Sequence, residues 1–183
     1  KVKNVQYDIM TNTPEQTMGI VVKEMKRCKR GAVRMGLGEV WLSPPCNTYC
    51  KMGPINKEHQ FRDAKNPLRK PIKGTKKGEQ AEEADALVQK ALKLIEFLAS
   101  KKAEQLRTGE MMVVEGVEVD LRGMEWFMEN PVGMLAMQDY MQQFLEEFQY
   151  DVVRRTVDYC AWGHYYQKPT HVWTSMIFWE PSG

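Results

Sequence analysis

A short apolar segment, Val40-Trp41-Leu42, stops abruptly at Ser43-Pro44-Pro45-Cys46. The apolar residues predict a buried strand, and the two prolines cannot continue its hydrogen bonding, so the chain must turn there. The turn leaves the Cys46 thiol at the carboxyl end of the strand, where ligands bind in open α/β sheets. Cys46 is therefore a candidate nucleophile, and the competing interpretation is a small buried apolar residue.

The rest of the chain alternates between strand-like and helix-like patterns, which predicts an α/β fold with a mostly parallel sheet covered by helices on both faces. The last two strands are separated by a short connection and could form an antiparallel pair. We expect strands at residues 4–9, 39–43, 124–128, 156–160 and 171–175. We expect helices at residues 14–30, 79–106 and 135–148, the first opened by a capping box at Thr13 and Gln16.

The 183 residues are enough for one domain with its own core. We expect a single, partial domain over residues 1–183, with a long basic loop at 47–78 and an inserted hairpin at 107–123. Such a long loop in a compact domain is usually functional or disordered. The net charge of +2 is too small to demonstrate a polyanionic partner or to argue against one.

A second candidate group follows the next apolar run, Trp126-Phe127-Met128. Glu129 comes directly after it, and Glu129-Asn130-Pro131 is expected to break the strand. The Asn-Pro step restricts Asn130 to an extended conformation and fixes the exit of the chain. A carboxylate in a partly apolar pocket at that strand end could keep a proton and donate it. The competing interpretation is an ordinary turn or capping residue.

Cysteine usage offers an alternative interpretation of the same region. Four cysteines in a chain of this length favour a reduced, intracellular protein over a disulfide scaffold. The pairs Cys46-x3-Cys50 and Cys160-x3-His164 would together supply ligands of the zinc type, although their spacing is at the edge of what structural zinc sites use. A zinc-stabilised nucleic-acid-binding module is thus a third hypothesis, but we expect no metal.

Three segments together resemble the cytosine-5 DNA methyltransferases, above all their compact viral, phage and protist branch. Ser43-Pro44-Pro45-Cys46 is similar to the family's Pro-Cys nucleophile motif, and Glu129-Asn130-Pro131 is similar to its Glu-Asn motif. The segment from Gln167 to Trp173 looks like its Gln-x-Arg-x-Arg motif, with Pro169 and His171 where arginines are usual. The three follow the family's order at roughly its spacing.

The resemblance implies part of a Rossmann-like, S-adenosylmethionine-dependent methyltransferase fold that acts on a flipped-out cytosine in DNA, with RNA as an open alternative. Cys46 would attack C6, Glu129 would protonate or hydrogen-bond N3, and Asn130 would orient the turn. The other implied site residues are substrate contacts at Ser43, Pro45, Asn47, Gln167, Lys168 and Thr170, and methyl-donor contacts at Asp8 and Pro44.

The family's Gly-x-Gly loop for the methyl donor is absent, because Gly36-Leu37-Gly38 precedes a strand rather than opening a helix. The resemblance therefore implies that a longer chain or a larger assembly supplies the donor-binding half. An inactive relic that serves as a structural or nucleic-acid-binding subunit is the alternative. We expect no membrane association, and an intracellular location that is nuclear, viral or phage-associated, or within an organelle.

Overall fold

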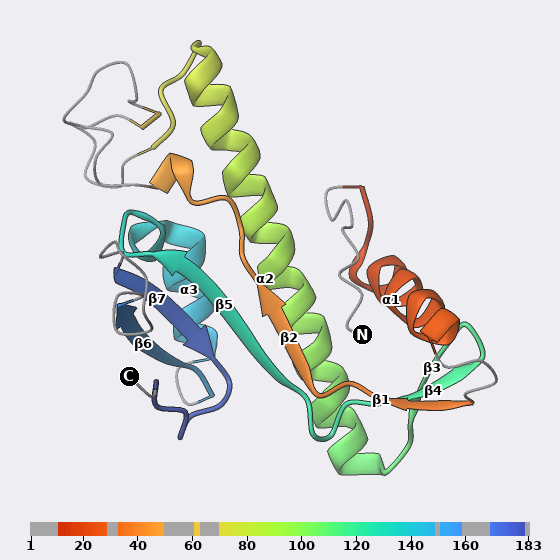
Figure 1. Cartoon of the computed structure of the whole chain (residues 1–183). Coiled ribbons are helices and arrows are strands. Elements are labelled where there is room, and N and C mark those ends of the chain that lie inside the picture. Colours follow the sequence, from red (N-terminus) through yellow and green to blue (C-terminus); the bar gives the residue numbers. More distant parts are fainter. Residues whose placement is uncertain are drawn as a thin grey trace. The chain divides into compact units, whose positions relative to one another are not determined.

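The computed structural model describes residues 11–28, 33–49, 61–62, 70–148, 151–158 and 169–181, and the predicted strand at 4–9 lies outside them. Its elements, shown in Figure 1, are α1 (Pro14–Cys28), β1 (Arg34–Gly36), β2 (Glu39–Leu42), the 3-10 helix η1 (Asn47–Tyr49), α2 (Lys76–Thr108), β3 (Met112–Val114), β4 (Val117–Asp120), β5 (Glu125–Pro131), the 3-10 helix η3 (Leu135–Met137), α3 (Asp139–Glu147), β6 (Val153–Asp158) and β7 (Pro169–Thr174).

The chain divides into two compact units. Unit 1 consists of residues 1–40 and 90–125, and unit 2 consists of residues 41–89 and 126–183. Helix α2 is continuous, so its first part belongs to unit 2 and the remainder to unit 1.

Unit 1 contains a small sheet in the order β1-β4-β3, in which β1 is parallel to β4 and β3 is antiparallel to it. The β3–β4 hairpin turns at Glu115 and Gly116, whose φ angles are +50° and +70°, as tight two-residue hairpin turns require. The buried Gln105 on α2 holds β4 from the side. Its Nε2 donates to Val119 O at 2.7 Å, and its Oε1 accepts from Leu121 N at 2.8 Å.

The start of α1 confirms the capping box predicted from the sequence. Thr13 N donates to Gln16 Oε1 at 2.8 Å, and Gln16 N donates to Thr13 Oγ1 at 3.3 Å. These reciprocal bonds give partners to amide groups that have none within the helix itself.

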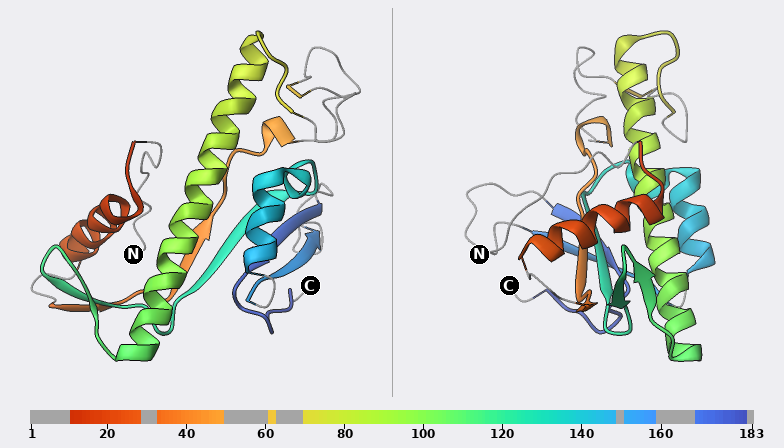
Figure 2. Two further views of the ribbon diagram at one scale, coloured as in Figure 1. Left: turned by 180° about the vertical axis from the view of Figure 1, so that it is seen from behind. Right: turned by 90° about the vertical axis from the view of Figure 1, so that its right-hand side faces the viewer.

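Unit 2 is built on a sheet in the order β2-β5-β7-β6. The arrows of β2 and β5 run in the same direction in Figure 1, whereas β7 is antiparallel to both β5 and β6. The first part of α2 and all of α3 lie on one side of this sheet (Figure 2). Trp126 on that side meets Phe144 of α3 edge to face, with ring centroids 5.8 Å apart. The opposite side carries a buried cluster of Phe127, Val157 and Val172 against Trp179.

The α/β class predicted from the sequence is confirmed, but the sheet arrangement differs from the prediction. The described strands form two mixed sheets rather than one mostly parallel sheet. Within the described part of unit 2, both helices lie on one face of the sheet, where helices on both faces were expected. The predicted antiparallel pair near the end of the sequence is present as β6 and β7.

The extent of several elements also differs from the prediction. Strand β5 continues through the Glu129-Asn130-Pro131 segment that was expected to break it, and Pro131 still pairs with Thr170 of β7. Proline is tolerated because it ends the strand, and the next amide, Val132 N, resumes the bonding by donating to Pro169 O at 2.8 Å. Strand β1 was not predicted, because three residues are too few to give a recognisable apolar pattern.

The predicted helix at 135–148 is divided into η3 and α3 at Gln138, whose backbone is extended. Among the described residues, no helix combines the length and apolar character needed to cross a membrane.

Candidate active site

A side-chain hydrogen bond joins the first two candidate motifs. The amide of Asn130, near the end of β5, donates from Nδ2 to the carbonyl oxygen of Pro44 at 3.2 Å. Asn130 is completely buried, so this contact is shielded from water. The turn that carries Cys46 is therefore attached to the strand end that carries Glu129.

Strand β7 brings part of the third segment to the same edge. In the β5–β7 ladder, Asn130 lies opposite His171 and Pro131 lies opposite Thr170. Thr170, predicted to contact substrate, is fully buried within the sheet. The ends of β2 and β5 and the start of β7 thus bring together segments that are widely separated in the sequence (Figure 1).

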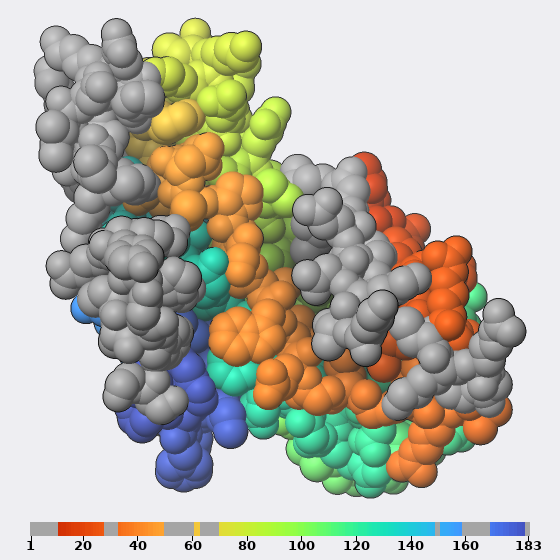
Figure 3. Space-filling model, in the orientation of Figure 1, coloured from red at the N-terminus to blue at the C-terminus, as the bar shows by residue number. Residues whose placement is uncertain are grey.

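The two reactive candidates at this edge are both partly accessible. Cys46 has a free thiol, and its side chain and that of Glu129 are each half-buried. The orange segment over residues 33–49 lies at the molecular surface in Figure 3. Of the predicted substrate contacts around Cys46, Ser43, Pro45 and Asn47 are exposed.

Glu129 points to the face of the sheet that carries Phe127 and Trp179. Side chains alternate along a strand, so Glu129 shares a face with Phe127 and, across the ladder, with Val172. Phe127 in turn stacks on Trp41 of β2, with ring centroids 4.3 Å apart and planes 6° from parallel. Glu129 therefore lies on the same face of the sheet as these apolar residues.

Asn130 also has unused hydrogen-bonding capacity. Its Oδ1 is buried, and no donor in the described part of the chain bonds to it. A buried amide oxygen without a donor is unfavourable unless a water molecule or a ligand supplies one. This oxygen is an acceptor within the site that could receive a donor from a bound molecule.

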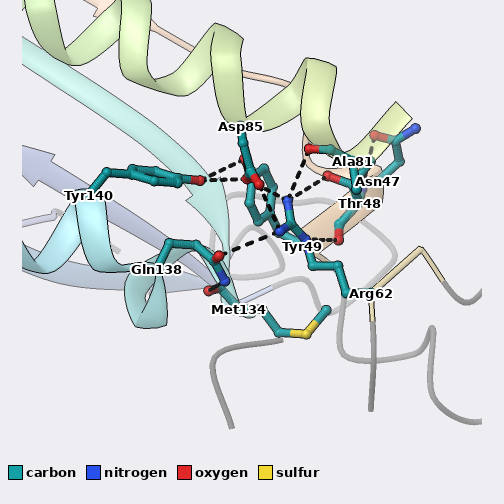
Figure 4. A network of polar contacts seen from close by, with 9 residues as sticks. All are labelled: Asn47, Thr48, Tyr49, Arg62, Ala81, Asp85, Met134, Gln138 and Tyr140. Atoms are coloured by element: carbon teal, nitrogen blue, oxygen red, sulfur yellow. Dashed lines mark hydrogen bonds and ion pairs between the residues drawn. The ribbon is translucent and has the colours of Figure 1, made fainter. Parts of the chain in front are cut away.

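A buried polar network holds the turn that follows Cys46, and sequence analysis did not predict it (Figure 4). At its centre is Arg62, whose side chain is completely shielded from solvent. Its guanidinium bonds both oxygens of Asp85 on α2, from Nη2 to Oδ1 at 2.6 Å and from Nη1 to Oδ2 at 3.1 Å. Its Nε donates to Thr48 O at 2.9 Å, and its charge lies 4.3 Å above the Tyr49 ring.

Two tyrosine hydroxyl groups complete the network. Tyr49 and Tyr140 both donate to Asp85 Oδ1, at 2.8 and 2.7 Å, and their oxygens are 2.9 Å apart. Burial raises the pKa of each hydroxyl well above its ordinary value near 10, and the negative charge of Asp85 adds to the increase. Both tyrosines are therefore neutral hydrogen-bond donors at physiological pH.

These shifts predict a loss of stability in alkali. Above about pH 10 the unfolded chain releases the two tyrosine protons while the folded chain retains them, so the free energy of unfolding decreases as pH rises. In Tyr140→Phe this decrease should be shallower than in the native chain. Chemical denaturation from about pH 9 to about pH 12 measures both slopes, and equal slopes would show that Tyr140 is not coupled to folding.

The sequence contained a weak signal for one half of this network. Asp85 lies on the apolar face of α2 among the buried Ala81, Ala84 and Val88, where a carboxylate requires a positively charged partner. Nothing in the sequence distinguished Arg62 from the other basic residues of the predicted loop. Only the fold brings it to Asp85.

Several predicted residues lie outside the described part of the chain: Asp8, Gln167 and Lys168, and the zinc candidates Cys50, Cys160 and His164. Among the residues that the structure describes, no group of three or more His, Cys, Asp or Glu side chains could hold a metal ion.

The segment Gly36-Leu37-Gly38 does not have the setting of a cofactor-binding glycine loop. Gly36-Leu37-Gly38 connects β1 to β2, so it does not open a helix whose amide groups could hold a bound cofactor. A cavity of about 830 Å³ does exist in unit 1, between α1, α2 and the β3–β4 hairpin. No candidate site residue lines it.

Comparisons with models of known protein families, with curated proteins and with solved structures found no match. The likeness to cytosine-5 methyltransferases thus depends on the three sequence motifs alone.

Proposed function

We propose that this chain carries the nucleophile and the acid of a cytosine-5 methyltransferase, acting on a cytosine flipped out of DNA. The observation that carries the proposal is the hydrogen bond from Asn130 Nδ2 to Pro44 O. It joins the Pro-Cys turn to the Glu-Asn strand end through the buried side chain of Asn130. The bond thus joins two motifs that lie far apart in the sequence, as the proposed chemistry requires.

The chemistry requires both groups. Cytosine C5 is a poor nucleophile, but addition of the Cys46 thiolate to C6 converts the ring into an enamine that reacts at C5. Glu129 would hydrogen-bond or protonate N3 and so stabilise the charge that develops on the ring. Loss of the C5 proton and elimination of the thiolate would then restore the aromatic ring.

The methyl group would come from S-adenosylmethionine, as in the family that the sequence resembles. Because the sequence lacks the family's Gly-x-Gly loop, we propose that the donor-binding part lies in a longer chain or in a larger assembly. Strand β2, helix α2 and strand β5 would then be one βαβ unit of a Rossmann-like methyltransferase fold, with β3 and β4 inserted before β5.

Basic residues near the start of α2 are consistent with a nucleic-acid partner. Lys73 and Lys76 are exposed there, and Lys70 pairs with Asp139 at 2.6 Å. Lysines of this kind contact phosphates without reading sequence, so they support DNA and RNA equally. The choice of DNA follows from the resemblance.

The test is release of tritium from C5 of cytosine in a labelled oligonucleotide. Reversible addition of Cys46 to C6 exchanges the C5 hydrogen with water, so this measurement does not need the methyl donor. We expect Cys46→Ser to lower the rate at least about 1,000-fold and Glu129→Gln to lower it about 100-fold or more. Cys50→Ser is the matched control and should retain the native rate.

A second measurement extends the test to the donor. With S-adenosylmethionine and 5-fluorocytosine the adduct cannot eliminate, so its mass identifies both the base and a functional donor site. Tritium release without a trapped adduct would mean that the donor half is missing. If neither DNA nor RNA releases tritium, the proposal is wrong, and oligonucleotide binding without release would instead favour the inactive relic.

A further inference from the structure

Each of the three guanidinium nitrogens of Arg62 has a hydrogen-bond acceptor. These acceptors explain why an arginine can occupy a buried position. Besides Asp85, Nη1 reaches Gln138 Oε1 at 3.5 Å, and Nη2 reaches Ala81 O at 3.4 Å and Thr48 Oγ1 at 3.5 Å. A lysine has a single ammonium group and cannot reproduce this planar, forked arrangement.

The contacts of Arg62 converge on the residues immediately after Cys46. Thr48 accepts from Arg62 Nε, and Tyr49 lies beneath the guanidinium. Tyr49 N donates to Cys46 O at 3.1 Å, so the position of Tyr49 limits the position of Cys46. Arg62 thereby attaches the Cys46 turn to α2 through Asp85 and to Gln138, the residue that precedes α3.

The same turn is attached to β5 and to the segment after it. Asn130 holds Pro44 on the side that precedes Cys46, and Met134 N donates to Tyr49 O at 2.8 Å on the side that follows. Cys46 is therefore fixed by contacts on both sides, although its own side chain is only half-buried. Reacting groups need such fixed geometry, because a displacement of about 1 Å can cost 100-fold in rate.

We infer that Arg62 is a positioning residue, which together with Asp85 fixes the turn that carries the Cys46 nucleophile. The expected loss of activity rests on the proposed function, whereas the expected loosening of the turn does not. In this role Arg62 acts on the turn through Thr48 and Tyr49. Loosening these contacts should leave the Cys46 thiol chemically intact but should displace it from its target.

The experiment compares Arg62→Lys with the native chain by hydrogen exchange and by the tritium-release assay. We expect the amides of Tyr49 and Met134 to exchange about tenfold faster or more, while those of the β6–β7 ladder keep their native rates. Tritium release should fall about 10- to 100-fold with unchanged affinity for the oligonucleotide. Arg122→Lys, at an exposed arginine paired with Asp120, should change neither measurement.

The variant Asp85→Glu covers the case in which Arg62→Lys does not fold. It retains the charge but moves the carboxylate by one methylene group, so it should give the same local pattern of exchange. Unchanged exchange at Tyr49 and Met134 in the folded variants would overturn the inference, as would a uniform increase throughout unit 2. If the native chain releases no tritium, the proposed function fails, and hydrogen exchange alone still decides whether Arg62 fixes the turn.

Discussion

Replacement of Asp85 by asparagine should be among the most destabilising single changes in this protein. The substitution keeps the shape of the side chain but leaves the Arg62 guanidinium, which is completely buried, without a counter-charge. Breaking a buried ion pair by removing one partner costs about 3–5 kcal/mol, because the remaining charge is neither solvated nor neutralised. Chemical denaturation of Asp85→Asn should show a decrease of that size in the free energy of unfolding.

Asp139→Asn is the matched control, because its carboxylate also pairs with a basic side chain at 2.6 Å but is 62% exposed. Exposed pairs contribute about 1 kcal/mol or less, so this variant should remain close to native. The double variant Arg62→Met/Asp85→Leu removes both charges and should lose less stability than Asp85→Asn alone. Equal losses in Asp85→Asn and Asp139→Asn would show that the Arg62–Asp85 pair is not buried in solution.

Gly133→Ala should disturb both stability and the candidate active site. A Cβ atom at Gly133 would lie 2.2 Å from Tyr49 O and 3.2 Å from Tyr49 C, and neither backbone atom can move aside as a flexible side chain would. The turn after Cys46 must therefore shift away from β5. We expect a loss of about 1–3 kcal/mol in the free energy of unfolding. We also expect about 100-fold slower tritium release.

Gly123→Ala provides the comparison, since no atom lies within 4 Å of a Cβ built at that position. Such a substitution is neutral or slightly stabilising, because alanine restricts the unfolded chain more than glycine does. If Gly133→Ala retains both native stability and the native rate of tritium release, then the turn is not packed against the exit of β5. Native stability with slow tritium release would show instead that the shift of the turn affects the chemistry alone.

The elements that the sequence predicted well are those determined by local patterns. The helix over 79–106 has an apolar stripe along one face, and the structure has α2 at Lys76–Thr108. Thr13 and Gln16 cap α1 through bonds between neighbours in the chain. The inserted hairpin followed from Gly116, which supplies the positive φ that its turn requires. Each depends on residues that are close in sequence.

The predictions that failed concern contacts between distant segments. Pro131 was expected to break its strand, but pairing with β7 extends β5 through it. The prediction of a mostly parallel sheet was wrong because β7 lies between β5 and β6. Local sequence patterns do not encode that strand order. The predicted loop over 47–78 includes Arg62, which is buried because Asp85 neutralises it.

The sequence by itself determined the α/β class, the main helices, and the order of the Pro-Cys and Glu-Asn motifs, because apolar periodicity and turn residues act over a few positions. Only the tertiary structure decided that Asn130 meets Pro44 and that Arg62 holds the turn after Cys46. Burial of a charge or an amide is favourable only when distant partners satisfy it, and those partners are brought together by the packing of strands and helices.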